Sequence, residues 1–495
     1  MLRKTKLSAA AGLFWFLAVH LLSAPALAQP GLLDTRVESI HSDFARLATA
    51  TVAVRAIDVA TGEVIADFDH QGGPTRIGSG LIPASNQKLL TTGAALHLLP
   101  PDFHFTTRLL VNGGELIIEG SGDPAFGDPE LLAVSDPPQT ADGFLGWLAD
   151  ATRQAGLERP AGIVVDDSIF DNERIHPTWK RNQLNRGYSA EVAGLNFHTN
   201  VLVFRIRATG AGRAPSYEIS PGVSRANWIE VSNRARSITS GRNTVWIARA
   251  LNGARYTLSG DVRSADVDVT MFDAPMMTGR IIAQQFAGDG SPPPPVRRVN
   301  PNETFESAEV AAIVRTPLDP IIERINTDSQ NMYAEALMKR LGNALTGEPG
   351  SWSNGAAAVR MVIQSRLGPA HAAETRIADG SGYSRENRVH PDSLAAWLVD
   401  LGRDAEIGPR FMASLASAGE GTLGRRFRDG TLRGDVFAKS GTLNHVRCLS
   451  GYWTGGGRTV AFVCLVNDLE RGSAERDARL FHEKVVEAID AELAG

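Results

Sequence analysis

The stretch Ser85-Asn86-Gln87-Lys88 is the only S-x-x-K pattern in the chain, and the apolar residues after it predict a helix that ends near Leu99. A spacing of three places the side chains of Ser85 and Lys88 on one face of that helix. A serine hydroxyl becomes a good nucleophile when a neighbour removes its proton, and Lys88 can do so only as a neutral amine. Taken alone, the pattern is a weak signal, and a capping serine with a surface lysine would be the favoured explanation.

Two further patterns favour a nucleophilic site. Ser329-Gln330-Asn331 directly precedes a predicted helix, and Lys439-Ser440-Gly441-Thr442 opens a predicted strand. Each alone has an ordinary explanation, as a helix cap or as a turn. The order S-x-x-K, S-x-N and K-S/T-G, with each pattern at the expected kind of element, is a specific signal.

Lysine is scarce in this chain, since only seven of the 50 basic residues are lysine. Five lie beyond residue 28: Lys88, Lys180, Lys339, Lys439 and Lys484. Arginine keeps its proton in proteins, whereas a buried lysine can lose it. Each of these five lysines is therefore a candidate for a role that needs an amine able to lose its proton. Two of them, Lys88 and Lys439, lie in the motifs.

The composition is that of a globular protein of 495 residues, with 43% hydrophobic and 21% charged residues. The formal net charge is −5, and without the first 28 residues the chain has 47 basic against 55 acidic residues, a net charge of −8. A mildly acidic body argues against a nucleic-acid partner and against binding to an anionic membrane surface.

Residues 1–28 have the pattern of a secretory signal peptide. Arg3, Lys4 and Lys6 precede an apolar run at 13–22, and Ala26-Leu27-Ala28 is a small-x-small cleavage signal. An uncleaved anchor helix is the less favoured alternative, because the run is short for a membrane span. No later stretch is long and apolar enough to span a bilayer. We therefore expect export to the periplasm and no transmembrane segment after cleavage.

The two cysteines, Cys448 and Cys464, are too few for a disulfide scaffold and do not supply a zinc site. They flank a predicted hairpin whose turn we place at Gly455-Gly456-Gly457. A three-residue turn would set the two sulfurs opposite each other on one side of the sheet. A cross-strand disulfide and two buried free thiols are equally compatible with this pattern.

The predicted secondary structure changes in character twice along the chain. Helix-like and strand-like segments precede residue 104, short strand-like runs between Gly and Pro turns continue to about 285, and helices return after a linker at 288–295. The later predicted helices include 304–314, 331–341 and 475–493. We predict an α+β fold in which one domain, residues 29–103 and 300–495, is split by a β-rich insert, residues 104–299, of two subdomains.

The three motifs in this order resemble those of penicillin-binding proteins and serine β-lactamases. The large insert is similar to that of the D-alanyl-D-alanine carboxypeptidase/endopeptidase branch, the penicillin-binding protein 4 type. Other stretches resemble that branch as well: Ser121-Gly122-Asp123-Pro124, Asp379-Gly380-Ser381-Gly382-Tyr383-Ser384-Arg385, Ala418-Gly419-Glu420-Gly421-Thr422-Leu423 and Leu449-Ser450-Gly451-Tyr452. Gln330 stands where Asp is frequent and Ser440 where Thr is frequent. The resemblance implies a transpeptidase-like antiparallel sheet with helices.

The resemblance also implies residue roles. Ser85 would attack the carbonyl carbon between two D-amino acids, Lys88 would take its proton, and Ser329 would pass a proton to the leaving amine. The substrate-binding residues would be Asn331 on the amide side, Lys439 as a positive charge that also lowers the pKa of Lys88, Ser440, Gly441 and Thr442 at the terminal carboxylate, and Ser381 near the ligand. The backbone N–H groups of Ser85 and Thr442 would form the oxyanion hole.

The implied function is hydrolysis of peptidoglycan stem peptides at D-Ala, as a carboxypeptidase, an endopeptidase or both. β-Lactams would act as covalent inhibitors at Ser85. We expect no cofactor, and the eleven histidines show no H-E-x-x-H or paired metal-binding spacing. The alternatives are a serine β-lactamase, in which the acyl-enzyme hydrolyses quickly, and a non-catalytic protein that binds the cell wall.

Overall fold

The computed structural model describes residues 32–222, 228–288, 290–427 and 432–494. The predicted signal peptide, residues 1–28, lies outside these ranges. Among the helices of the described residues, none has both the length and the apolar character needed to cross a membrane.

The main sheet has six strands in the order β18-β19-β20-β21-β1-β2, and every neighbouring pair is antiparallel. It joins the two ends of the chain, because β1 pairs with β21 across some 400 residues of sequence. Its strands are β1 (Thr51–Asp58), β2 (Val64–Gln71), β18 (Ala416–Ser417), β19 (Asp435–Leu443), β20 (Val446–Gly455) and β21 (Arg458–Asn467).

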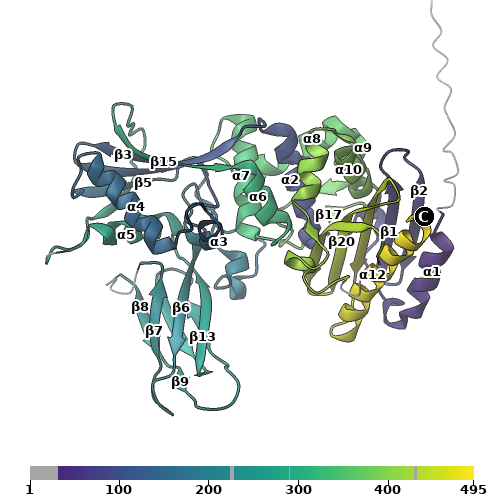
Figure 1. The fold of residues 1–495 in the computed structure, drawn as a ribbon, viewed down its shortest axis with the longest axis horizontal. Coiled ribbons are helices and arrows are strands. Elements are labelled where there is room, and N and C mark those ends of the chain that lie inside the picture. Colours follow the sequence, from purple (N-terminus) through teal and green to yellow (C-terminus); the bar gives the residue numbers. More distant parts are fainter. Residues whose placement is uncertain (1–31, 223–227, 289, 428–431, 495) are drawn as a thin grey trace, which may run out of the picture.

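Helices cover both faces of this sheet (Figure 1). Along β21, alternate residues enter two different cores: Phe462 and Cys464 belong to one, Val463 and Leu465 to the other. This alternation follows from the period of two in a strand. The core that contains Phe462 and Cys464 also contains residues of α1 (Asp34–Asp43) and α12 (Ser473–Leu493). The core that contains Val463 and Leu465 includes residues of six helices: α2 (Gln87–Leu98), α6 (Leu318–Asn326), α7 (Asn331–Thr346), α8 (Trp352–Leu367), α10 (Pro391–Arg403) and α11 (Ile407–Ala413).

A second lobe lies beside this domain and has its own hydrophobic core (Figure 1). Its mixed sheet has the order β14-β5-β4-β3-β15, and α4 (Ala141–Gln154) and α5 (Ala274–Ala283) pack against it. The strands are β3 (His104–Asn112), β4 (Glu115–Gly120), β5 (Gly162–Asp166), β14 (Val296–Arg298) and β15 (Glu309–Pro317).

Shorter strands extend from the second lobe as a separate projection (Figure 1). They pair in the orders β13-β6-β7, β10-β11-β8 and β12-β9. Their bounds are β6 (Val201–Arg207), β7 (Ser216–Ser220), β8 (Glu230–Asn233), β9 (Arg236–Ser237), β10 (Trp246–Arg249), β11 (Arg255–Ser259), β12 (Asp261–Val262) and β13 (Ser264–Thr270); the remaining short elements are α3 (Pro129–Ala133), α9 (Pro369–Ala373), β16 (Thr375–Arg376) and β17 (Arg388–Val389).

The α+β prediction is confirmed, but the predicted helix at 304–314 is wrong. Residues Glu309–Pro317 form β15, which pairs antiparallel with β3. β-Branched residues such as Val310 and Ile313 favour a strand, and the partner that completes the ladder is 200 residues away in sequence. Because β15 belongs to the second sheet, we propose that the insert extends to about residue 317; the division at residue 299 stays a prediction.

The predicted turn of the β20–β21 hairpin is also wrong by one residue. Gly455 pairs with Arg458, so the turn is the two-residue Gly456-Gly457, and both glycines have positive φ. A shift of one residue moves a side chain to the other face of a sheet. Cys448 therefore pairs with Leu465, and the two buried cysteines lie on opposite faces as free thiols.

Candidate active site

Ser85 lies in a short 3₁₀ turn, Ala84–Asn86, that leads directly into α2. Ala84 has a φ of 46°, in the left-handed region that a residue with a Cβ adopts only at a cost. Neighbouring strands hold this turn, because Asn86 Nδ2 donates to the Lys439 carbonyl oxygen at 2.6 Å and the Ser450 hydroxyl donates to Asn86 Oδ1 at 3.1 Å. Sequence reasoning missed Asn86, whose only signal was its place inside the S-x-x-K pattern.

Lys88 is fully buried, and its Nζ lies 3.3 Å from Ser85 Oγ. The same Nζ donates to Asn331 Oδ1 at 2.7 Å and to the Ser381 carbonyl oxygen at 2.8 Å. Burial lowers the pKa of Lys88 to about 7, although the negative charge of Glu335 acts in the opposite direction. Near neutral pH much of Lys88 is therefore the free amine, the form that can accept a proton from Ser85.

Glu335 on α7 is a second residue that sequence reasoning missed. Its buried carboxylate accepts the backbone N–H groups of Gly380 and Ser381 and the Trp352 Nε1–H, each at 2.8 Å. Burial raises the pKa of Glu335 to about 7. These bonds hold Ser381 in place, and the carbonyl oxygen of Ser381 accepts a hydrogen bond from Lys88. The signal available in the sequence was an acidic residue among the apolar residues of a predicted helix.

Asp379 begins the loop that carries Ser381, and it connects this loop to the predicted insert. Its carboxylate accepts Trp179 Nε1–H at 2.9 Å, the Gly382 backbone N–H at 2.8 Å and Asn387 Nδ2–H at 2.7 Å. Trp179 belongs to the predicted insert, so the insert contributes to the shape of the loop behind Lys88.

The third motif lies on β19 beside the Ser85 turn. Lys439 is fully buried and its Nζ donates to the Ser440 carbonyl oxygen at 3.0 Å. Burial, and after it the positive charge of Lys88, lower the pKa of Lys439 well below its usual value. Repulsion between the two amines thus contributes to the lowered pKa of Lys439, whereas burial is what lowers the pKa of Lys88. That Lys439 lowers the pKa of Lys88 stays a prediction.

Gly441 allows β19 to approach the Ser85 turn. A Cβ at this position would lie 2.9 Å from the Pro83 carbonyl oxygen, 3.0 Å from the Cβ of Cys448 and 3.2 Å from the Cβ of Ala84. The first distance is shorter than contacts of a real Cβ. The glycine of the motif is therefore explained by close packing between the strand and the turn.

Ser329 and Asn331 come from the loop before α7 and from its first residue. Ser329 has a φ of 65° and lines the cavity in front of Ser85. Besides accepting Lys88, Asn331 donates from Nδ2 to the Tyr188 carbonyl oxygen at 2.8 Å. Asn331 therefore connects Lys88 to the predicted insert.

Ser381 differs from our expectation that it lies near the ligand. Its side chain is fully buried, and its hydroxyl accepts the Tyr383 backbone N–H at 3.2 Å. The contact with the site is made by its carbonyl oxygen, which receives Lys88. We therefore propose that Ser381 positions Lys88.

A cavity of about 830 Å³ opens in front of Ser85. Five of the predicted site residues line it: Ser85, Ser329, Asn331, Ser440 and Thr442. The other four, Lys88, Ser381, Lys439 and Gly441, are buried. Within the described ranges no group of three or more His, Cys, Asp or Glu side chains is placed to hold a metal ion.

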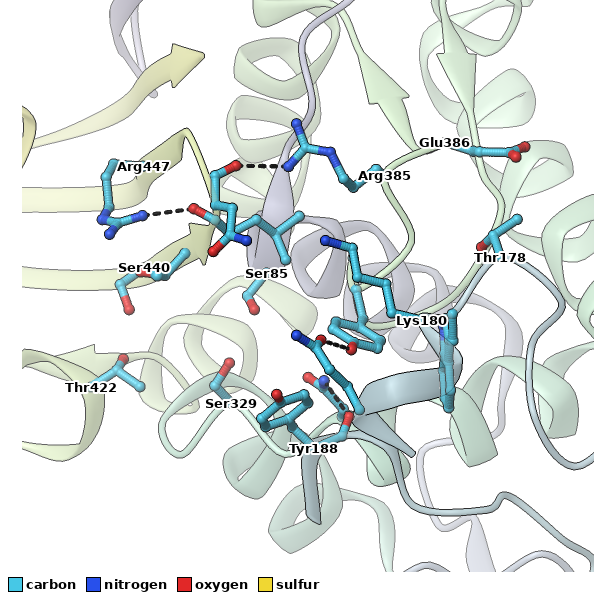
Figure 2. Close-up of a pocket in the computed structure, with 18 of the residues that line it drawn as sticks. Ser85, Thr178, Lys180, Tyr188, Ser329, Arg385, Glu386, Thr422, Ser440 and Arg447 are labelled. Atoms are coloured by element: carbon cyan, nitrogen blue, oxygen red, sulfur yellow. Dashed lines mark hydrogen bonds between the residues drawn. The ribbon is translucent and has the colours of Figure 1, made fainter. Parts of the chain in front are cut away.

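The predicted insert forms one wall of this cavity. Lys180 and Tyr188 lie on one side of Ser85, and Ser440 and Arg447 lie on the other (Figure 2). The Tyr383 hydroxyl donates to Gln183 Oε1 at 2.5 Å. This bond joins the loop that begins at Asp379 to the wall formed by the insert. The cavity in front of Ser85 is therefore lined by residues of the predicted insert as well as by residues of the three motifs.

Comparison with known proteins gives a consistent result. Residues 33–486 match the D-Ala-D-Ala carboxypeptidase 3 (S13) family. The chain is 30% identical to the D-alanyl-D-alanine carboxypeptidase of Actinomadura sp. (strain R39), over 91% of this chain and 85% of that protein. It is 24% identical to the D-alanyl-D-alanine carboxypeptidase DacB of Haemophilus influenzae, over 86% and 87% respectively.

The fold is similar to the crystal structure of penicillin binding protein 4 (dacB) from Haemophilus influenzae. The TM-score is 0.70 at 22% sequence identity, over 89% of this chain and 98% of that one. The same protein complexed with a novel β-lactam gives a TM-score of 0.68 at 21% identity, over 92% and 99%. These matches confirm the predicted penicillin-binding type of α+β fold.

Proposed function

Because this chain belongs to the D-Ala-D-Ala carboxypeptidase 3 (S13) family of serine peptidases, we propose that it acts through an acyl-enzyme on Ser85. The observation that carries the proposal is the buried Lys88 amine, 3.3 Å from Ser85 Oγ and with its pKa lowered to about 7. Such an amine is neutral often enough at neutral pH to serve as a general base. The expected substrate is a peptidoglycan stem peptide ending in D-Ala-D-Ala.

In the first step Ser85 Oγ forms a bond to the carbonyl carbon of the penultimate D-Ala while Lys88 takes its proton. The negative charge that develops on the carbonyl oxygen would be stabilised by the backbone N–H groups of Ser85 and Thr442. The C–N bond then breaks, and the leaving amine receives a proton. Water finally hydrolyses the ester, which releases the shortened peptide and restores Ser85.

Ser329 is our candidate for proton delivery to the leaving amine, since its side chain faces the same cavity as Ser85. Lys439 is buried on β19 and would supply positive potential when it is protonated. Ser440 and Thr442 would donate hydroxyl hydrogen bonds to the terminal carboxylate of the substrate. Asn331 would form a hydrogen bond to the amide side of the substrate while its Oδ1 accepts a hydrogen bond from Lys88.

We extend the proposal to β-lactams, which would acylate Ser85 and hydrolyse slowly. The complex of the Haemophilus influenzae protein with a β-lactam supports this extension, because that protein shares the fold. Export to the periplasm, inferred from residues 1–28, and endopeptidase cleavage of cross-links complete the proposed function.

The test uses the mature protein and its Ser85→Ala variant with a stem pentapeptide and a fluorescent penicillin. We expect wild-type protein to release D-Ala and to stay labelled, and the variant to do neither. Rapid turnover of the penicillin without labelling would favour a β-lactamase. Unchanged D-Ala release by the variant would rule out Ser85 as the nucleophile, and no release by either protein would favour a cell-wall binding role.

A further inference from the structure

The predicted insert contains a cavity of its own, of about 570 Å³, which we call the insert cavity. Its lining comes from the segment 181–186 and from β10 together with Leu251. None of the residues that line it belongs to the three motifs or lines the cavity in front of Ser85. The proposed chemistry therefore leaves the insert cavity without a role.

The two cavities are bordered by one short segment of chain, residues 180–188. Lys180 and Tyr188 lie at the cavity in front of Ser85 (Figure 2), whereas Arg181 and Arg186 line the insert cavity. Neighbouring residues of the same segment thus serve different cavities. A long polymer whose end is bound at Ser85 can therefore extend to the insert cavity across this segment.

The lining of the insert cavity is cationic. It contains three arginines, Arg181, Arg186 and Arg249, and no acidic residue. Within the part of the chain that the structure describes, no carboxylate lies within ion-pair distance of these three guanidinium groups. Because the chain beyond residue 28 has a net charge of −8, this is a local concentration of positive charge on an acidic protein. The cavity therefore favours an anionic ligand.

Arg249 is the buried cation of this lining, with only 9% of the residue exposed. Its guanidinium donates to Thr270 Oγ1 at 3.0 Å and to the carbonyl oxygens of Ala250 and Leu184 at 3.1 and 3.4 Å. All three acceptors are neutral. Burial lowers the pKa of Arg249, although the negative charge of Glu191 acts in the opposite direction. An anion in the cavity would compensate part of the cost of burying this charge.

An exposed tryptophan lies among these cations. Trp246, the first residue of β10, lines the insert cavity and is 48% exposed. An indole ring offers a large flat apolar surface, and the C–H face of a sugar ring packs well on such a surface. The cavity therefore combines a surface for a sugar ring with cations for carboxylates.

We propose that the insert cavity is a second binding site for peptidoglycan, in which a sugar ring packs on Trp246 and the carboxylates of an attached acidic peptide bind Arg181, Arg186 and Arg249. This inference rests on the proposed function, because the wall polymer that supplies the stem peptide for Ser85 carries sugar rings and carboxylates on one chain. The site holds the polymer while Ser85 acts on another stem peptide of it.

The test measures how penicillin-acylated protein sediments with purified peptidoglycan sacculi, since acylation of Ser85 blocks the first cavity. We expect acylated wild-type protein to bind. The double variant Arg181→Ala/Arg186→Ala should bind about three- to tenfold more weakly, as for the loss of two exposed ion pairs. Its D-Ala release from a soluble stem pentapeptide should stay within about twofold of wild type, because neither side chain lines the cavity at Ser85.

Arg234→Ala/Arg242→Ala is the matched control, because it removes two exposed arginines of the same insert that lie outside the insert cavity. This control should bind sacculi as wild type does. On sacculi whose carboxylates have been amidated, the Arg181/Arg186 variant should not differ from wild type, whereas Trp246→Ala should still bind more weakly. Higher salt should weaken the binding of wild type more than that of the Arg181/Arg186 variant.

Three results would overturn the inference: no binding of acylated wild-type protein to sacculi, equal binding by wild type and the Arg181/Arg186 variant, or a preference for anionic phospholipid vesicles over sacculi. A parallel loss of D-Ala release in that variant would overturn it too, because the segment 180–188 would then act on the active site. All four results leave Ser85 as the proposed nucleophile. Failure of penicillin labelling and of D-Ala release, with sacculus binding intact in unlabelled protein, would instead contradict the proposed function.

Discussion

The Glu335 carboxylate accepts the backbone N–H of Ser381 at 2.8 Å, and the carbonyl oxygen of Ser381 accepts Lys88 Nζ at the same distance. Glu335 thus acts on the proposed base in two ways. It fixes one of the oxygens that orient the amine, and its negative charge raises the pKa of Lys88 against the effect of burial. This arrangement makes Glu335 a positioning residue with a measurable electrostatic effect.

Glu335→Gln should lower the pKa of Lys88, because the substitution removes a negative charge that favours the protonated amine. The acid limb of the pH profile of penicillin acylation should therefore move to lower pH, by less than for a permanent charge, because the pKa of Glu335 is itself raised to about 7. The variant should also lose about 1 to 3 kcal/mol of stability, since glutamine offers one acceptor oxygen to three donors. The exposed Glu323→Gln should change neither quantity, and an unmoved profile in Glu335→Gln would remove its assigned effect on Lys88.

The wild-type acylation rate should itself depend on pH through Lys88. The base must be neutral, and its pKa is lowered to about 7. The second-order rate of penicillin labelling should thus rise about tenfold per pH unit below 7 and level off above it. A rate that is flat from pH 5 to pH 8 would contradict a titrating Lys88. Stopped labelling reactions with gel fluorescence suffice for the measurement.

Lys88→Arg should lower acylation by a factor of about 10² to 10⁴, the usual contribution of a general base. Arginine keeps a positive charge but cannot give up its proton at these pH values. The exposed Lys484→Arg is the matched control. Retained penicillin labelling of Lys88→Arg would refute Lys88 as the base, provided that the thermal unfolding of the two variants is similar.

Gly441→Ala should slow acylation because the new Cβ would meet the Pro83 carbonyl oxygen at 2.9 Å. The substitution should push β19 away from the Ser85 turn, which disturbs Ser85 and the proposed oxyanion hole together. Gly146→Ala, within α4 and with open space at its Cβ, should leave acylation unchanged. It should also stabilise the protein by up to about 1 kcal/mol. Labelling rates and melting temperatures of the two variants check this contrast.

Cys448 and Cys464 should behave as two free, protected thiols. Burial raises the pKa of both thiols, so that native protein should react slowly with alkylating reagents. After denaturation without reductant, mass spectrometry should find two alkyl groups. Alkylation only after reduction would indicate a disulfide, which the opposite orientation of the two side chains argues against.

The sequence by itself predicted Ser85 and Lys88 as nucleophile and base, contained the other two motifs and predicted the α+β fold. These features are local, because a spacing of three on a helix or a period of two in a strand is visible in a single sequence. The tertiary structure alone decided the rest. It brought the Asn86 side chain to the Lys439 carbonyl oxygen, the Glu335 carboxylate to the Ser381 backbone N–H, β15 to β3, and arginines of α12 into the lining of a cavity that Ser440 also lines. Burial lowers the pKa of Lys88, the register of β20 and β21 places the two cysteines on opposite faces, and packing of α12 brings its arginines to the main sheet. These contacts join residues far apart in the chain, so they exist only once the chain has folded.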